Sequence, residues 1–556
     1  MSRPCIPAIA FTGLLALALS PAAGANPLNR DRDPLVLTGA SLSELLGDAP
    51  GGIVAFRYDG GWTQIPVQID ERKIVDFGTI YDSTATGFTI LTYADAGTFT
   101  GGDPDPTFDA DDELVLMGRE AGTRAVFAGE PAGVLAGSGL ELAVTNPLTG
   151  TAAYAYLFLG DGSLFPNAGA PDFSYDFVLL AGDYKTHYDV HNGPNPENSM
   201  VTTSAYSVHF ADRWICGHMH VTKGGASGVD ILDRRKALFA PGNCTRSENT
   251  FSNGEGAFIV NRKGPVRALR GYVGANSGPT SHRIHAFYEE REDVLTMLRV
   301  HPIPGIVDFF DYSPAATGMT YRNNLNLTGV TIDGNDDAVT RGPIVWEMVS
   351  GLQGTLAMSL GLTTNIPGFR HSSYYLDDST PLVTQCTGDN AAYGSSGIQV
   401  SDAIPNTDPA LGAYSIFEAS RVIAYGPPSQ GAAFAEIAHD EATHPLTAAA
   451  APYDPGRSAV ADGGNLPGAG MLQLSFSPNP FRGPVRIRFS QAAPGTFSVS
   501  LHDVTGRLVA KWVEGTWESG VHEVVRDATG LPAGIYLARA RDAAGGERTV
   551  RVVHIK

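Results

Sequence analysis

Residues 284–300 read Ile-His-Ala-Phe-Tyr-Glu-Glu-Arg-Glu-Asp-Val-Leu-Thr-Met-Leu-Arg-Val, and this stretch decides the fold class. Two strand-like runs flank a turn of five charged residues, 289–293, which predicts an antiparallel β-hairpin. The run at 266–273 precedes them and adds another strand. Arginines stand among the apolar residues of these strands, so we expect a sheet with one wet or ligand-facing side.

The same β pattern continues through the rest of the chain. Residues 53–58 and 62–69 are strand-like, and Asp59-Gly60-Gly61 between them is typical of a hairpin turn. The best helix candidate is residues 432–442. The 556-residue chain has 65 glycines and only 17% charged residues, which is typical of β-rich secreted proteins. The sequence therefore predicts a mostly β protein made of antiparallel β-sandwich domains.

The first 25 residues predict a signal peptide. Arg3 makes the N-terminal end of this segment positively charged, residues 9–19 are apolar, and Ala23-Gly24-Ala25 is a small-residue cleavage site. The apolar run is shorter than the ~20 residues that a membrane-spanning helix needs, and no later run reaches that length. We therefore expect export and no transmembrane segment. The formal net charge of −20 argues against a nucleic-acid partner, because phosphate binding needs a basic surface.

Changes in composition divide the chain. After the signal peptide at 1–25, we expect an N-terminal β domain at 26–169 and a central β-sandwich domain at 170–449 that holds the active or binding site. Residues 450–470 are rich in Ala, Gly, Pro and Asp, which predicts a linker. Residues 471–556 contain short, regularly spaced strands, which predict a separate small sandwich.

This last part carries a series of motifs. They are Phe-Ser-Pro-Asn-Pro-Phe at 476–481, Val-Arg-Ile-Arg-Phe at 485–489, Leu-His-Asp-Val-Thr-Gly-Arg at 501–507, Leu-Pro-Ala-Gly-Ile-Tyr at 531–536 and Val-Val-His-Ile-Lys at 552–556. In these motifs the tail resembles the C-terminal sorting domain of the type IX secretion system, an immunoglobulin-like sandwich. Two positions depart from the family pattern: His502 replaces the usual Tyr, and Arg526 replaces a frequent Trp. The resemblance implies passage through the periplasm, recognition by the type IX machinery, and delivery to the medium or the cell surface.

An acidic loop between residues 103 and 113 is a candidate structural calcium site. Its carboxylates fall mostly at alternate positions, so they can converge on one hard cation. The loop lacks the Gly and Glu positions of an EF-hand, and a solvated acidic turn is the alternative. The candidate ligands are Asp103, Asp105, Asp109, Asp111 and Glu113.

Export to an oxidising compartment permits disulfides. Three of the four cysteines follow the signal peptide, and we expect the closer pair, Cys216 and Cys244, to form a disulfide. Cys386 is then left over.

Histidines are concentrated in the central region, where eight of 14 lie between His187 and His301. On a strand, His218 and His220 would share one face, a spacing suited to metal binding or acid–base chemistry. Arginine can neutralise a uronate carboxylate while Tyr, His or Lys moves protons, so this mix suits a polyanionic sugar. The candidate catalytic residues are Tyr184, His187, His218, His220, Arg283 and His285.

These features favour a secreted protein that acts on extracellular polysaccharide, as a polysaccharide lyase or a glycoside hydrolase. Residues 251–300 also resemble the galactose-mutarotase-like super-sandwich of several polysaccharide lyases, which implies a carbohydrate-active fold. Two alternatives stay open. One is a non-catalytic glycan-binding or adhesion protein, with Trp62, Trp214 and Trp346 as stacking platforms. The other is a zinc or copper metalloenzyme built on His218 and His220.

Overall fold

The computed structural model describes residues 27–81, 87–165, 168–169, 173–187, 197–239, 248, 256–274, 280–300, 303–366, 368–380, 389–403, 415–456, 473–477, 481–491, 494–503, 507–518, 520–528, 530–532, 534–543 and 547–554. The fold is mostly β, which confirms the predicted class: the strands form antiparallel sheets, and helices are few and short in the described ranges. The predicted signal peptide lies outside the described residues. Within them, no helix is both long and apolar enough to span a bilayer.

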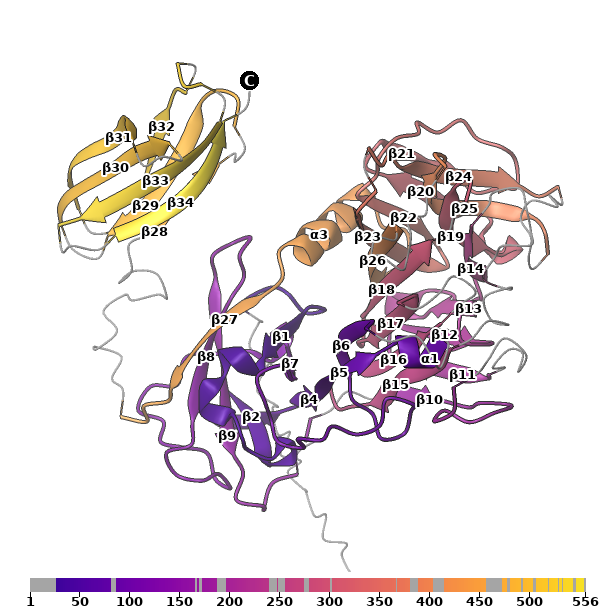
Figure 1. Cartoon of the computed structure of the whole chain (residues 1–556), viewed down its shortest axis with the longest axis horizontal. Coiled ribbons are helices and arrows are strands. Elements are labelled where there is room, and N and C mark those ends of the chain that lie inside the picture. Colours follow the sequence, from indigo (N-terminus) through magenta and orange to yellow (C-terminus); the bar gives the residue numbers. More distant parts are fainter. Residues whose placement is uncertain are drawn as a thin grey trace, which may run out of the picture.

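The N-terminal unit is a sandwich of two sheets (Figure 1). One sheet has the strand order β27-β8-β9-β2-β3, and the other has the order β1-β7-β4. Leu35 and Leu116 of the smaller sheet share a buried core with Leu142 and Leu157 of the larger one. The strand bounds are β1 (Pro34–Thr38), β2 (Ile53–Tyr58), β3 (Trp62–Ile65), β4 (Gln68–Asp70), β7 (Glu113–Met117), β8 (Leu140–Thr145), β9 (Ala152–Leu159) and β27 (Thr447–Pro452).

Strand β27 returns to the N-terminal unit from far along the chain. It pairs antiparallel with β8, from Thr447 opposite Thr145 to Pro452 opposite Leu140. The structure differs here from the sequence prediction, which ended the central domain at 449 and began the linker at 450. The sequence prediction missed this strand because it is rich in alanine, which is depleted in strands and suggests a linker instead. The other domain boundaries stay predictions.

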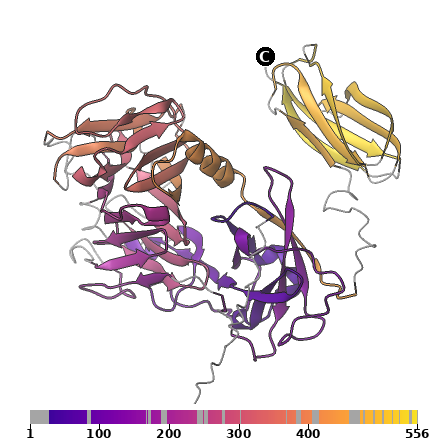
Figure 2. The ribbon, with the colours of Figure 1, turned by 180° about the vertical axis from the view of Figure 1, so that it is seen from behind.

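The central unit is a larger antiparallel sandwich (Figures 1 and 2). Its large sheet has the order β15-β16-β17-β18-β26-β23-β22-β20-β21. Two four-stranded sheets, β10-β11-β12-β13 and β14-β19-β25-β24, share a buried core with it through residues such as Val208, Tyr312 and Ile423. The strand bounds are β10 (Ser174–Asp176), β11 (Ser199–Thr202), β12 (Tyr206–Phe210), β13 (Cys216–Val221), β14 (Leu232–Leu238), β15 (Ala257–Lys263), β16 (Ala268–Val273), β17 (His282–Phe287), β18 (Arg291–Val300), β19 (Ile306–Tyr312), β20 (Thr320–Asn323), β21 (Asn326–Thr331), β22 (Trp346–Gly351), β23 (Gly354–Thr364), β24 (Ser372–Asp378), β25 (Ala392–Val400) and β26 (Ser415–Gly426).

The hairpin that decides the fold class lies in the middle of the large sheet. Strands β17 and β18 pair from His282 opposite Met297 to Phe287 opposite Glu292, which confirms the hairpin. The turn is shorter than the expected 289–293, because Arg291, Glu292 and Asp293 already belong to β18. The expected helix is also present as α3 (Ala432–Thr443). Ala435 and Ala438 of α3 belong to a small buried cluster with strands β22, β23 and β26.

A short hairpin covers the other end of the large sheet. It consists of β5 (Arg72–Asp76) and β6 (Thr89–Tyr93), with the single helical turn α1 (Gly78–Tyr81) between them. Phe77 and Ile80 of this segment are fully buried in one cluster with Ile259 and Leu269 of β15 and β16. The N-terminal and central units therefore share an apolar interface.

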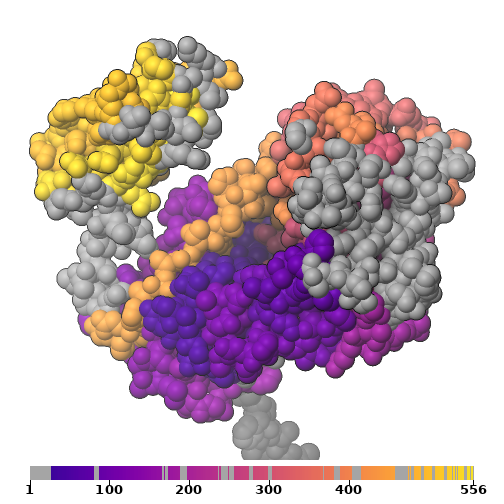
Figure 3. Space-filling view, in the orientation of Figure 1, coloured from indigo at the N-terminus to yellow at the C-terminus, as the bar shows by residue number. Residues whose placement is uncertain are grey.

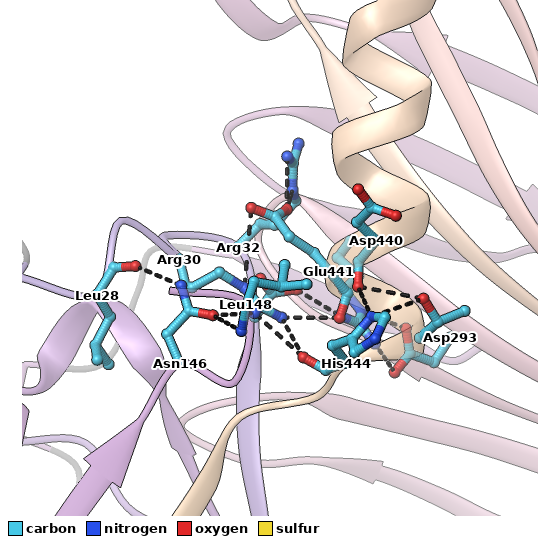
Figure 4. A network of polar contacts seen from close by, with 12 residues as sticks. Leu28, Arg30, Arg32, Asn146, Leu148, Asp293, Asp440, Glu441 and His444 are labelled. Carbon is cyan, nitrogen blue, oxygen red and sulfur yellow. Dashed lines mark hydrogen bonds and ion pairs between the residues drawn. The ribbon is translucent and has the colours of Figure 1, made fainter. Parts of the chain in front are cut away.

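Arg30 stands at a polar junction between the two units (Figure 4). Its guanidinium donates to Asp33 Oδ2 at 2.5 Å, to Asn146 Oδ1 at 3.1 Å and to the Glu441 carbonyl at 2.8 Å, near the end of α3. Asp33 also accepts a hydrogen bond from Arg291, the first residue of β18, at 2.6 Å. Figure 3 shows α3 and β27 as one continuous orange band along the surface of the two units.

The C-terminal unit is a small sandwich of a three-stranded sheet, β28-β29-β32, and a four-stranded sheet, β31-β30-β33-β34. Phe489 of β29 stacks on Phe497 of β30, with ring centroids 4.1 Å apart, so the two sheets share one core. The bounds are β28 (Gln473–Ser477), β29 (Val485–Gln491), β30 (Gly495–Asp503), β31 (Leu508–Trp517), β32 (Gly520–Arg526), β33 (Gly534–Asp542) and β34 (Glu547–His554).

Candidate functional sites

The arginines of the large central sheet are buried. Arg270 of β16 is fully buried and pairs with Glu197, and Arg283 of β17 donates from Nη2 to Glu248 Oε1 at 2.5 Å. The prediction of a wet sheet face is wrong at these positions, because carboxylates from other segments cover the arginines. Such partners are required, since an unpaired charge in the interior is strongly destabilising.

His285, a predicted catalytic residue, belongs to the same buried layer. Its Nδ1 lies 2.8 Å from Glu292 Oε1, and Glu292 also accepts hydrogen bonds from Arg235 at 3.5 Å and from the Tyr425 hydroxyl at 3.1 Å. Burial, together with the neighbouring arginines, holds the pKa of His285 well below its usual value. His285 is therefore a neutral imidazole, and its buried Nε2 has no hydrogen-bond partner among the described residues.

Glu248 lies in the same buried layer, and its pKa suits acid–base catalysis near neutral pH. Burial raises the pKa of its carboxyl group to about 7, against the opposing effect of Arg283. Its second oxygen, Oε2, has no partner in the part of the chain that the structure describes. Arg283 is the second residue of β17, so the pair lies near one end of the sandwich. A carboxyl group that titrates near neutral pH can take up and release a proton, as general acid–base catalysis requires.

Aromatic side chains surround this pair. The Arg283 guanidinium lies 5.0 Å from the centroid of the Trp214 ring, which is 4.8 Å from that of Tyr272. Burial raises the pKa of Tyr272 to about 12, and its hydroxyl has no described hydrogen-bond partner. Tyr184 packs against the same cluster and stacks on Phe177, with centroids 4.1 Å apart. Of the candidate catalytic residues, the structure thus brings Tyr184 and Arg283 to one cluster.

His218 and His220 lie elsewhere, on the outer face of the sheet formed by β10 to β13. Both are at least partly exposed, while Met219 between them is buried. On β12, His209 stands opposite His218, whereas the next residue, Phe210, points inward and contacts the His285 ring at 5.2 Å. The sheet therefore separates His218 and His220 from His285, and these residues do not face a common cleft.

The remaining predicted residues are also dispersed. The His187 ring lies 6.3 Å from the Phe99 ring of the N-terminal region. Within the described residues Cys216 is a free, buried thiol, and burial raises its pKa to about 12. A neutral buried thiol is unreactive. Cys244, its predicted partner, lies outside the described residues, as does Cys386.

The acidic loop contains one compact group of carboxylates. Asp109, Asp111 and Asp112 have oxygens within 4.8 Å of one another. A hydrogen bond shared with Asp109, and then partial burial, raises the pKa of Asp111 to about 6, so these two residues hold a proton between them in mildly acidic solution. The loop therefore supplies an acidic cluster of the type that binds hard cations.

The other three candidate calcium ligands have different partners. Asp103 accepts a hydrogen bond from the Asp105 amide at 2.9 Å, and Asp105 accepts one from the Thr107 hydroxyl at 2.7 Å. Glu113 pairs with Arg72 at 2.9 Å and with Arg267 at 2.5 Å. Glu113 is thereby committed to a buried ion-pair network, which the sequence spacing did not indicate.

The three tryptophans are not exposed platforms. Trp214 and Trp346 are 1% and 4% exposed. Trp62 packs among aromatic residues, with its ring 4.9 Å from Tyr156 and 5.6 Å from Tyr453. The structure therefore gives no support to stacking of a glycan on these rings.

Sequence reasoning missed Glu248 and Tyr272. Glu248 stands in a polar stretch without strand or helix periodicity, and Tyr272 has the pattern of an ordinary strand residue. Only the fold shows that both approach Arg283. The one available signal was the arginine in the middle of an apolar strand, which predicts a hidden carboxylate partner.

Comparison with known proteins identifies the tail. Residues 475–556 match the family of secretion system C-terminal sorting domains, which confirms the resemblance drawn from the motifs. The protein is thus a type IX secretion substrate that is delivered outside the cell or to its surface. Curated proteins give no match to this chain.

The chain is distantly similar to several solved structures. A protein in glycosyl hydrolase family 38 from Enterococcus faecalis has 10% identity and a TM-score of 0.38, over 90% of this chain and 56% of that chain. A polysaccharide lyase has 8% identity and a TM-score of 0.20, over 70% and 47%. Dimeric latent PorU from Porphyromonas gingivalis has 11% identity and a TM-score of 0.16, over 72% and 35%. The chain spans about half the length of the first two, and likenesses this distant carry no conclusion about chemistry.

Proposed function

We propose that the exported protein acts on an anionic extracellular polysaccharide at the Glu248–Arg283 pair. The observation that carries the proposal is a carboxyl group with a pKa of about 7, bonded to an arginine and near Tyr272, whose hydroxyl has no hydrogen-bond partner among the described residues. A perturbed carboxyl with a specific charge partner is a feature of many active sites. The sorting domain delivers the protein to the compartment where such polymers occur.

The residue set suits elimination from a uronic acid. Glu248, Arg283 and Tyr272 are all buried, so a sugar would reach them only after local opening at this end of the sandwich. Arg283 would then neutralise the uronate carboxylate and make the adjacent C–H more acidic. Glu248 would take that proton, the bond from the neighbouring ring carbon to the glycosidic oxygen would break to leave a C=C bond, and the Tyr272 hydroxyl would protonate the departing oxygen. Hydrolysis needs a second free carboxyl facing the first. Like Glu248, Glu197 and Glu292 are buried and paired with arginines, so the reaction products, rather than these pairs, distinguish elimination from hydrolysis.

A panel of polysaccharides tests this proposal. Elimination produces unsaturated ends that absorb in the ultraviolet, whereas hydrolysis produces reducing ends without that absorbance. Binding without either product would favour the glycan-binding alternative. If neutral and anionic polymers were all neither cleaved nor bound, the proposed function would be refuted.

Calcium binding by the acidic loop is a separate proposal. Asp109, Asp111 and Asp112 support it by their proximity. The role would be structural, because the loop leads into β7, at the interface between the N-terminal and central units.

A further inference from the structure

Three histidines form one group on the outer face of the β10–β13 sheet. His209 on β12 stands directly opposite His218 on β13, and His220 follows two residues later on the same face. The His209 and His218 rings have centroids 5.0 Å apart. Two imidazoles that share one tetrahedral zinc ion have ring centroids about 5 Å apart, because each nitrogen lies ~2.1 Å from the ion. We call His209, His218 and His220 the outer-face triad.

Each member of the triad has one ring nitrogen engaged, and the described residues offer no hydrogen-bond partner to the other nitrogen. His218 Nδ1 lies 2.5 Å from Asp230 Oδ2, and His220 Nδ1 lies 2.9 Å from the Gly228 carbonyl oxygen. Because a carbonyl oxygen only accepts hydrogen bonds, His220 carries its hydrogen on Nδ1 and keeps the lone pair of Nε2. The carboxylate of Asp230 favours the same tautomer for His218.

His209 completes the pattern from the neighbouring strand. Its Nε2 lies 2.8 Å from Asn198 Oδ1, which leaves Nδ1 as the acceptor nitrogen. His209 Nδ1 is buried and has no hydrogen-bond partner within the described part of the chain.

We propose that the outer-face triad binds one late first-row transition metal ion, with Zn²⁺ as the expected occupant. Imidazole nitrogen suits Zn²⁺ and Cu²⁺, whereas Ca²⁺ and Mg²⁺ prefer oxygen. The hydrogen bonds that His218 and His220 donate to Asp230 and to the Gly228 carbonyl are those that orient metal-binding histidines, with a carboxylate or carbonyl behind the ring. Met200 stands opposite His209 on β11 and is 40% exposed, so a thioether lies beside the site.

Binding requires a small adjustment of the side chains. Among the described residues, only Asp109, Asp111 and Asp112 already have ligand atoms within 4.8 Å of one another, so at least one imidazole of the triad must turn toward the ion. The His218 side chain is 55% exposed and has room to do so. Two protein strands then supply three ligands, and the fourth position faces solvent.

The test is zinc titration of the full chain, produced without a histidine tag and stripped with EDTA. Calorimetry should give one site per chain for the wild type, and the site should be lost in His218→Ala. Asp230→Asn should weaken binding about 10–100-fold, because it removes only the orienting carboxylate. Cu²⁺ should occupy the same site, and its electron paramagnetic resonance spectrum should show nitrogen ligands that disappear in His218→Ala.

Two control variants make the result specific. His522→Ala removes a half-buried histidine of the sorting domain, outside the β10–β13 sheet, and should leave zinc binding unchanged. Asp109→Asn should also leave it unchanged, since that residue belongs to the acidic cluster. Zinc binding that survives His218→Ala with the wild-type affinity, or that is abolished by Asp109→Asn, would overturn the assignment. The metal-free His218→Ala protein should unfold at the wild-type temperature, which separates loss of a ligand from loss of the fold.

Discussion

Arg267 and Glu113 form a partly buried ion pair, with Nη2 and Oε2 2.5 Å apart, that joins the central unit to strand β7 of the N-terminal unit. Arg267 is 3% exposed, and it also bonds Asp70 at 2.8 Å and the Tyr288 hydroxyl at 3.1 Å. The Arg267 guanidinium therefore links one carboxylate of β4, Asp70, and one of β7, Glu113, to the central sheet. The network adds a buried polar contact to the apolar interface between the two units.

Removing this arginine should destabilise the protein strongly. Arg267→Ala leaves the buried Asp70 carboxylate without its partner, and we expect the free energy of unfolding to fall by about 3–5 kcal/mol. Urea denaturation measures the change. Arg370→Ala is the control, because Arg370 is 81% exposed and its pair with Asp402 should contribute about 0–1 kcal/mol. Equal losses in the two variants would show that Arg267 does not hold the junction.

The pH dependence of stability should report on Glu347. Burial raises the pKa of this carboxyl from 4.5 to about 7, despite the opposing effect of Arg421. A raised pKa means that the stabilisation is complete below the unfolded value and disappears as pH rises through the folded value. Between about pH 5 and about pH 8, the wild type should therefore lose roughly 2–3 kcal/mol relative to Glu347→Gln. Exposed Glu523→Gln should follow the wild-type curve, and a Glu347→Gln curve parallel to the wild type would contradict the prediction.

Local patterns carried much of the fold prediction. The alternation in residues 284–300 and the turn at 59–61 are properties of neighbouring residues, so they predicted their hairpins correctly. The partners of the buried arginines could not be predicted in this way. Glu248 is 35 residues from Arg283, and Glu197 is 73 residues from Arg270, so no sequence spacing links either pair.

For the candidate site, too, the features of a single strand could be predicted, whereas the contacts between sheets could not. A period of two places His218 and His220 on one face of a strand, and both do lie on the outer face of β13. Closeness in sequence also grouped them with His285, although a sheet separates them in space. Which of two stacked sheets a histidine faces depends on how the layers pack, and the pattern of one strand does not encode that.

Calcium should stabilise the protein through the acidic loop. Chelation should lower the melting temperature of the wild type, and calcium should restore it, with a gain of about 3 kcal/mol at roughly a hundredfold excess over the Kd. Asp111→Asn should abolish this response. Asp105→Asn is the control in the same loop, because the Asp105 carboxylate is bonded to Thr107. A melting curve of metal-stripped wild type that calcium leaves unchanged would refute a site at this loop.

The sorting domain should be necessary for export but not for folding of the rest. A chain that ends at residue 470 keeps the N-terminal and central sandwiches, including β27, so we expect it to fold and to accumulate in the periplasm of a type IX-competent host. Cell fractionation followed by immunoblotting measures its location. A reporter fused to residues 457–556 should leave the cell in the same host. Normal release of the truncated protein would show that export does not depend on the tail.

The most direct test of the proposed activity compares Glu248→Gln with Glu347→Gln on an anionic polysaccharide that the wild type cleaves. Both glutamates are buried, and both have a pKa near 7, so the two substitutions make the same chemical change in similar surroundings. Only Glu248 bonds Arg283 beside Tyr272. We predict that Glu248→Gln lowers kcat about 10²–10⁴-fold, while Glu347→Gln, at matched folded concentration, stays close to the wild type. Equal activity of the two folded variants would contradict the assignment of Glu248 as the acid–base residue.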